Sequence, residues 1–140
     1  MCALCKTSSC SCLKDTGLLL LRLVLAVVFI YHGWAKITNI DATLGFFSQI
    51  GLGNIVLVYL AGYGEFIGGI LMGLGLLTRY ASLVLVAISA VAIGTVHISK
   101  GFGIMGGGYE YVLTLLVVSA AVGMMGAGRY SLDAKMRKNL

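Results

Sequence analysis

Four long apolar runs, separated by short polar segments, dominate the sequence. Each holds about 20 residues, the length that an α-helix rising 1.5 Å per residue needs to cross roughly 30 Å of hydrocarbon. The pattern predicts an all-α fold, an integral membrane four-helix transmembrane bundle. It would occupy residues 17–128, with spans near 17–36, 55–77, 80–98 and 109–127, between an N-terminal tail (1–16) and a C-terminal tail (129–140).

Composition supports a membrane protein. Of the 140 residues, 59% are hydrophobic and 11% are charged, and the chain has 20 glycines and no proline, whereas a soluble domain carries about 25% charged residues. This length leaves room for one bundle and no second domain. The first fifteen residues have no apolar core, so we expect no cleaved secretory signal, and the first apolar run should stay as a transmembrane helix in the lipid bilayer.

The basic residues lie at the ends of the apolar runs and indicate an orientation. Short segments rich in Lys and Arg stay cytoplasmic. One side of the predicted bundle holds Lys6, Lys14, Arg79, Arg129, Lys135, Arg137 and Lys138, against Lys36 and Lys100 on the other. We therefore expect a multi-pass protein of the cell inner membrane with both termini cytoplasmic; a three-span arrangement would place the basic C-terminus outside. Topology also explains the net charge of +5, so nucleic acid is not an expected partner.

The connections between the runs differ in length. The one at Thr78–Tyr80 is tight, which makes the second and third spans antiparallel neighbours. Residues 37–54 are half apolar, and lie either along the outer interface or in an ordinary outer loop with a short amphipathic turn. Glycines repeat at four residues in Gly64-x-x-x-Gly68 and Gly69-x-x-x-Gly73. Such small faces let a second backbone approach, from the same chain or from another copy in a homo-oligomer or a larger membrane complex.

Glu65 is the most unusual residue of the apolar runs. No charge separates it from Asp41 on one side or from Arg79 on the other, and it would lie roughly 15 Å inside the second span. A charge at that depth costs about 2.5–3.5 kcal/mol on insertion scales and marks a candidate functional site. Its partner would be Arg22, His32 or Lys36, and a purely structural ion pair between the first two spans is the alternative.

Further polar residues could join Glu65. Arg22 and Lys36 fall within about 40° of each other on the first span, and His32 is about 80° away. His97 ends the third span and Glu110 begins the fourth. The sequence predicts a ligand or proton pocket with Glu65 and Arg22 as its floor and His32, Lys36, His97 and Glu110 above it.

Each of these residues also has a simpler interpretation. Arg22 and Lys36 could extend to the lipid headgroups, and each histidine could be an interfacial residue hydrogen-bonded to backbone or water. Two histidines and two carboxylates could also bind a metal ion, but no His-x-x-His or Glu-x-x-His spacing is present, so no metal site is assigned to them.

Four cysteines, Cys2, Cys5, Cys10 and Cys12, form a C-x₂-C-x₄-C-x-C array in the N-terminal tail. Cytoplasmic thiols stay reduced. They could hold Zn²⁺ or an iron–sulfur cluster or act as a dithiol relay, or they could be free or lipidated thiols beside the membrane. No G-x-S-x-G motif or P-loop is present, so the sequence identifies no catalytic residue.

Several stretches together resemble the DoxX family of small four-span membrane proteins, over about residues 18–133. The matching pieces are Arg22 with Phe29–Lys36, the glycine-rich run from Glu65 to Arg79, Gly107–Tyr111 and Gly126–Asp133. The resemblance implies the four-span fold. It also implies a redox-linked role, because the family is named for a subunit of a thiosulfate:quinone oxidoreductase. The chain lacks the proline usual before the second span, and its cysteine-rich tail is not a general family feature.

Three functions are compatible with these features. The first is a redox-associated membrane subunit that binds a quinone or a similar amphipathic molecule in the bundle. The second is a transporter or channel-like module in which Glu65 and the histidines line a path for protons or a small solute. The third is a structural scaffold for a soluble redox enzyme, docked at Cys2, Cys5, Cys10 and Cys12.

Overall fold

The computed structural model describes residues 9–138, and all the regular structure in this range is helical, which confirms the all-α prediction. Three helical stretches, Cys12–Thr38, Ile55–Leu74 and Thr78–Lys100, are long and apolar enough to cross a membrane, and Glu110–Met125 is a shorter apolar helix. The elements are α1 (Ser9–Thr38), α2 (Ile40–Gln49), α3 (Ile55–Leu74), α4 (Thr78–Ala92), the π-helix η1 (Ile93–His97), the 3₁₀ turns η2 (Ile98–Lys100) and η3 (Ile104–Gly106), α5 (Glu110–Met125) and α6 (Leu132–Lys138).

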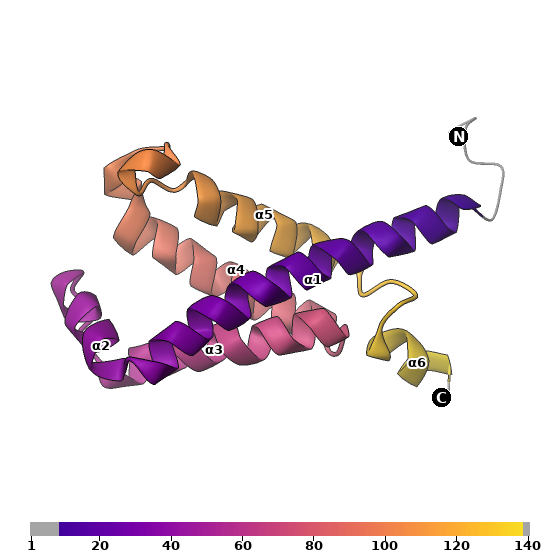
Figure 1. Ribbon diagram of the computed structural model, residues 1–140, viewed down its shortest axis with the longest axis horizontal. Helices are drawn as coiled ribbons and strands as arrows, with labels where there is room; N and C mark the ends of the chain where they lie inside the picture. The colour runs from indigo at the N-terminus through magenta and orange to yellow at the C-terminus, as the bar shows by residue number, and fades with distance from the viewer. Residues whose placement is uncertain (1–8, 139–140) are drawn as a thin grey trace.

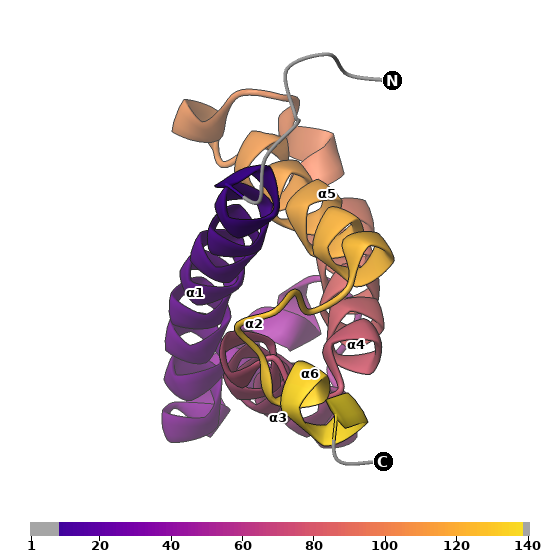
Figure 2. The same cartoon turned by 90° about the vertical axis from the view of Figure 1, so that its right-hand side faces the viewer.

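The long helices form two antiparallel pairs, α1 with α3 and α4 with α5 (Figure 1). The pairs meet at one end of the bundle, where α1 begins, α3 turns into α4 and α6 lies; we call this the tail end. They separate toward the opposite end, the loop end, which carries α2 and η1–η3. Figure 2 looks along the bundle from the tail end. The beginning of α1 and the C-terminal segment lie together, since Asp15 Oδ1 accepts a hydrogen bond from Arg129 N at 3.1 Å.

The glycines of α3 bring it into close contact with two neighbours. A Cβ atom on Gly69 would lie 3.0 Å from Ile30 N of α1, and one on Gly73 would lie 3.0 Å from Ala26 Cβ. Gly68 faces α4 instead, where a Cβ would lie 3.0 Å from Leu85 Cδ2. Both glycine repeats therefore serve contacts within the chain.

Three layers of side chains follow one another along the bundle axis. At the tail end, buried Arg22 and Thr78 lie beside the C-terminal segment. The middle layer is apolar and fully packed: Leu25, Met72, Leu85 and Val122 are each at most 1% exposed. Toward the loop end, the same four helices supply Phe29, Glu65, Ser89 and Leu115, which surround a cavity. The polar residues of the two ends are thus separated by the apolar layer.

The connections differ in detail from the sequence expectation. The tight turn lies at residues 75–77, just before Thr78, which already begins α4; Gly75 (φ 66°) and Leu77 (φ 49°) adopt left-handed backbone there. Residues 37–54 contain the helix α2, none of whose residues is buried. The glycine-rich segment after α4 packs against itself, since a Cβ on Gly108 would lie 2.2 Å from Gly101 O.

We predict that Gly33→Ala weakens the contact between α1 and α3. The new Cβ would lie 2.4 Å from Phe66 N and 2.7 Å from Gly62 O, so the two backbones must move apart, at a cost of about 1–3 kcal/mol. Thermal unfolding in detergent should show a lower melting temperature. Gly17→Ala on the same helix is the matched control, because nothing lies within 4 Å of its Cβ position. Equal melting temperatures for the two variants would contradict the close approach.

Candidate functional site

A cavity of about 190 Å³ lies between the two helix pairs, on the loop-end side of the apolar layer. Every long helix contributes to its wall, and η1 adds one residue. Polar and titratable side chains are mixed with apolar ones in the lining, which consists of Phe29, His32, Lys36, Glu65, Ile88, Ser89, Ala92, His97, Tyr111, Val112 and Leu115. Four of the six residues predicted from the sequence for a ligand or proton pocket, His32, Lys36, Glu65 and His97, thus meet at one place.

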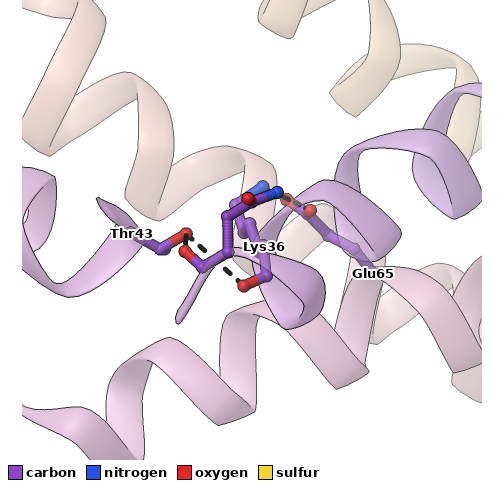
Figure 3. Close-up of polar contacts among 4 residues, drawn as sticks. Lys36, Thr43 and Glu65 are labelled. Atoms are coloured by element: carbon purple, nitrogen blue, oxygen red, sulfur yellow. Dashed lines mark hydrogen bonds and ion pairs between the residues drawn. The ribbon is translucent and has the colours of Figure 1, made fainter. Parts of the chain in front are cut away.

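Glu65 pairs with Lys36, and not with the other two candidates. Lys36 Nζ lies 2.5 Å from Glu65 Oε2, and the two side chains are 24% and 10% exposed (Figure 3). Pairing reduces the cost of burying the carboxylate, because the low-dielectric surroundings strengthen the attraction that offsets desolvation. Lys36 therefore extends into the bundle and not to the headgroups. Thr43 of α2 fixes the end of α1 nearby, where its hydroxyl donates to Lys36 O at 3.4 Å.

The two histidines reach the cavity from opposite helix pairs. His32 lies one turn before Lys36 on α1 and is exposed at the cavity's edge. His97 ends the π-helix η1, and its Nδ1 lies 2.7 Å from Gly107 O. A carbonyl partner requires a proton on Nδ1, so a neutral His97 keeps Nε2 as a hydrogen-bond acceptor. A π-helical turn inside an otherwise regular helix is often found at functional sites.

Two of the lining residues that were not predicted from the sequence carry hydroxyl groups. Ser89 of α4 is 2% exposed, and Tyr111 is the neighbour of a residue that was predicted. The sequence carries a signal for Ser89 in the spacing of small polar residues on α4. Ser82 comes four residues after Thr78, Ser89 comes seven residues after Ser82, and all three are buried. That spacing keeps them on one face of a helix, which here is the face directed into the bundle.

Glu110 is not part of the cavity lining. It begins α5, and its Oε2 accepts a hydrogen bond from Ile104 N at 3.0 Å, while its own backbone N donates to Phe102 O at 3.0 Å. The carboxylate thus closes the glycine-rich segment onto the start of the helix, where a negative charge is also favoured by the helix dipole. This position gives it a structural contact, and Tyr111, the next residue, lines the cavity instead.

Arg22 lies at the tail end, on the other side of the apolar layer from Glu65, so it does not form the floor of the cavity. It is 1% exposed and does not extend to headgroups. Its guanidinium donates to the carbonyl oxygens of Ala127 and Tyr130, the second at 2.6 Å. Backbone carbonyl oxygens of the segment that follows α5 therefore accept hydrogen bonds from the buried cation.

Asp133 completes the same arrangement from the C-terminal segment. Its carboxylate accepts from Leu77 N (2.8 Å), Thr78 N (3.0 Å) and Thr78 Oγ1 (2.9 Å), so it caps α4 from a distant part of the chain. Asp133 N in turn donates to Gly75 O at 2.9 Å. We call Arg22, Asp133 and residues 127–131 the tail latch, because together they connect α1, the α3–α4 turn and the C-terminal segment.

The tail latch changes the acidity of Asp133. Partial burial by itself raises the pKa of the carboxyl, but the hydrogen bonds from Thr78 and Leu77, together with the Arg22 charge, outweigh it and hold the pKa below its ordinary value of 3.8. The charged form of Asp133 is therefore the form that the folded chain stabilises.

The cysteine array lies mostly beyond what the structure describes. Cys2 and Cys5 lie outside the described residues, and the side chain of Cys10 is not described either. Cys12 is exposed, with its Sγ 3.7 Å from the Tyr130 hydroxyl. Among the side chains that are described, no three from His, Cys, Asp or Glu come close enough together to hold a metal ion. The hypothesis of a thiol or metal relay thus stays a prediction.

The fold and the cavity define a class: a small helical membrane protein with polar residues gathered inside its bundle. The chain belongs to the DoxX family, which matches residues 17–98, as the resemblance indicated. It is 32% identical over 119 residues, 85% of this chain and 86% of the relative, to a Bacillus subtilis protein named "Putative oxidoreductase CatD". It is 28% identical over 126 residues, 90% of this chain and 96% of the relative, to the inner membrane protein YqjF of Escherichia coli. No solved structure matches.

We predict that the tail latch makes stability depend on pH in the acid range. A carboxyl whose folded-state pKa is depressed contributes stability that is fully present above its ordinary pKa of 3.8 and is lost as the pH falls through the lower folded pKa. Unfolding of the wild type and of Asp133→Asn should be compared in detergent from neutral pH to about pH 2.5.

The expected result is a wild type that is more stable than Asp133→Asn at neutral pH, with a difference that shrinks as the solution becomes more acid. Asp41→Asn in α2 serves as the control, because no hydrogen bond to its carboxylate is found in the described part of the chain. A constant difference between wild type and Asp133→Asn across this range would mean that the charge of Asp133 does not stabilise the fold.

Proposed function

We propose that this protein is a redox-associated membrane subunit that binds the polar head of a quinone, or of a similar amphipathic molecule, in the cavity beside Glu65. The observation that carries the proposal is the meeting of Lys36, Glu65, His32 and His97 around one small space inside an apolar bundle. The name of the Bacillus subtilis relative, which includes the word oxidoreductase, supports a redox role.

The chemistry of the lining suits this ligand. Reduction of a quinone to a quinol takes up two electrons and two protons, and the ring oxygens need hydrogen-bond donors before the reaction and proton donors during it. Lys36 and the Ser89 and Tyr111 hydroxyls can donate to the ring oxygens, and Glu65, His32 and His97 can hold and transfer protons. The described residues offer no electron carrier, so the electrons would come from a redox partner in the same complex.

The apolar layer makes the transporter or channel interpretation the second choice. A path through the bundle would have to pass Leu25, Met72, Leu85 and Val122, which are at most 1% exposed. A cavity that lies on one side of a packed apolar layer fits binding better than transmembrane flux. Uptake of protons or solutes into proteoliposomes in the absence of any redox partner would reverse this preference.

We further propose that α1, α3, α4 and α5 are four membrane spans, with the tail end in the cytoplasm. With its 16 residues, α5 rises only about 24 Å, which a locally thinner bilayer can accommodate. The Asp15–Arg129 contact at the tail end fits an even number of crossings, and the basic residues of both tails fit the cytoplasmic side.

For the orientation, we predict that green fluorescent protein fused after Leu140 fluoresces in cells, since it folds in the cytoplasm. Alkaline phosphatase inserted at Gly53, between α2 and α3, should be active, because that enzyme needs the oxidising outer side. Phosphatase activity at the C-terminus with none at Gly53 would contradict the orientation.

For the site, we predict that Glu65→Gln weakens binding of a short-chain ubiquinone by about tenfold or more. The neutral amide no longer holds the Lys36 ammonium in the place from which it donates to a ring oxygen, and a hydrogen bond from a charged group is worth about 1.5–3 kcal/mol. Binding can be measured on protein in nanodiscs by native mass spectrometry. Glu110→Gln is the matched control, because it makes the same change to a carboxylate outside the cavity and should leave binding unchanged. Unaltered binding by Glu65→Gln, or no ubiquinone binding by the wild type, would overturn the proposed site.

A further inference from the structure

A second and larger hollow lies beside the cavity, on the outer side of α3 and α4. It is a groove of about 540 Å³, and its walls are apolar or aromatic, including Tyr59, Tyr63, Ile67, Leu71, Tyr80 and Val84. Tyr59 and Tyr63 stack on each other along α3, with ring centroids 6.0 Å apart and planes 21° from parallel. No charged side chain lines this groove, so its surroundings suit a hydrocarbon chain.

Only a thin partition separates the groove from the cavity. Gly64 lines the groove and Ile88 lines the cavity, and the two residues touch: a Cβ on Gly64 would lie 2.8 Å from Ile88 Cδ1. Because Gly64 has no side chain, its backbone packs directly against the terminal methyl group of Ile88, which is half-buried. A different rotamer of Ile88 would change this contact without movement of a helix.

The volumes indicate how the spaces would be used together. Ligand sites for whole small molecules usually measure about 300–1,000 Å³. The cavity, at about 190 Å³, is too small for a complete amphipathic molecule but large enough for a polar ring. The groove, at about 540 Å³, lies within the usual range and has no polar group to bind.

We propose that the groove holds the isoprenoid chain of the ligand whose polar head lies in the cavity, with the chain passing between Gly64 and Ile88. This inference rests on the proposed function and narrows the ligand class to a small polar ring on a long apolar chain, which reaches the site sideways from the bilayer. His32 of α1 and Tyr111 of α5 also line the cavity and are exposed. Those polar groups suit a headgroup and not a chain.

The test compares two probes that share one headgroup: ubiquinone with a single isoprenoid unit and ubiquinone with a full-length chain. Each is incorporated at the same mole fraction into nanodiscs that contain the full-length protein, and bound quinone is counted by native mass spectrometry. Val84→Phe fills the groove from α4, where Val84 is 44% exposed, and Ile67→Phe fills it from α3, where Ile67 is 50% exposed. Leu83→Phe is the control, because Leu83 is 67% exposed and does not line the groove.

The wild type should retain the long-chain quinone better than the short-chain one. Val84→Phe and Ile67→Phe should each reduce long-chain retention about tenfold, because the chain loses its buried contacts, and leave short-chain retention unchanged. Leu83→Phe should change neither. A folding defect would also reduce binding of the short-chain quinone. Each of the two filling variants must therefore bind the short-chain quinone as the wild type does.

Other outcomes would overturn the inference in distinguishable ways. In one such outcome, both quinones bind in a way that depends on Glu65, but neither the chain length nor either filling variant changes binding. This result would support the proposed function and show that the groove does not hold the isoprenoid chain. In another outcome, a filling variant still retains the long-chain quinone but loses a bound phospholipid, or changes from dimer to monomer. The groove would then be a site for lipid or for a second copy of the chain. Absence of binding by both quinones removes the function and the inference together.

Discussion

The charge of Glu65 requires a cation close by, and this requirement fixes how α1 and α3 meet. Lipid offers helices no hydrophobic reason to associate, so packing and polar contacts must hold them. Lys36 reaches the carboxylate at 2.5 Å because glycines let the two helices approach closely; a Cβ on Gly62 would lie 3.3 Å from Lys36 Cβ. The ion pair and the small residues therefore depend on each other: without the glycines Lys36 could not reach, and without Lys36 the buried charge would oppose the contact.

The two ends of the bundle are held by different means, and this difference leaves a cavity at the loop end. At the tail end, Arg22 and Asp133 use hydrogen bonds to backbone groups to join segments that are far apart in sequence. At the loop end, the helix pairs are apart, and polar groups from both face one cavity. The apolar layer between the ends keeps the two sets of charges from interacting, which explains how a chain of 140 residues can hold one structural and one chemical cluster.

The apolar runs predicted the helices well, because membrane-spanning length and composition are local properties of the sequence. Side-chain partners were harder to predict, since they depend on helix rotation and on segments distant in sequence. Arg22 lies on the same face of α1 as Lys36. In the folded chain, however, it lies beside the segment after α5 and donates to backbone carbonyl oxygens there, and no sequence pattern indicates these partners. Glu110 was expected in the pocket because it begins a helix on the correct side, and the backbone N–H of Ile104 competes successfully for it.

Gly64 illustrates how one residue type can serve two purposes in such a bundle. In a repeat with Gly68 its obvious role is helix packing, and its contact with Ile88 fulfils that role. The same missing side chain also places the backbone of Gly64, which lines the groove, directly against Ile88, which lines the cavity. A larger residue at this position would separate the polar space from the bilayer permanently, or would push α4 away from α3. In the proposed binding mode, a glycine keeps the helices packed and lets a rotation of the Ile88 side chain, in place of a helix movement, control access from the membrane.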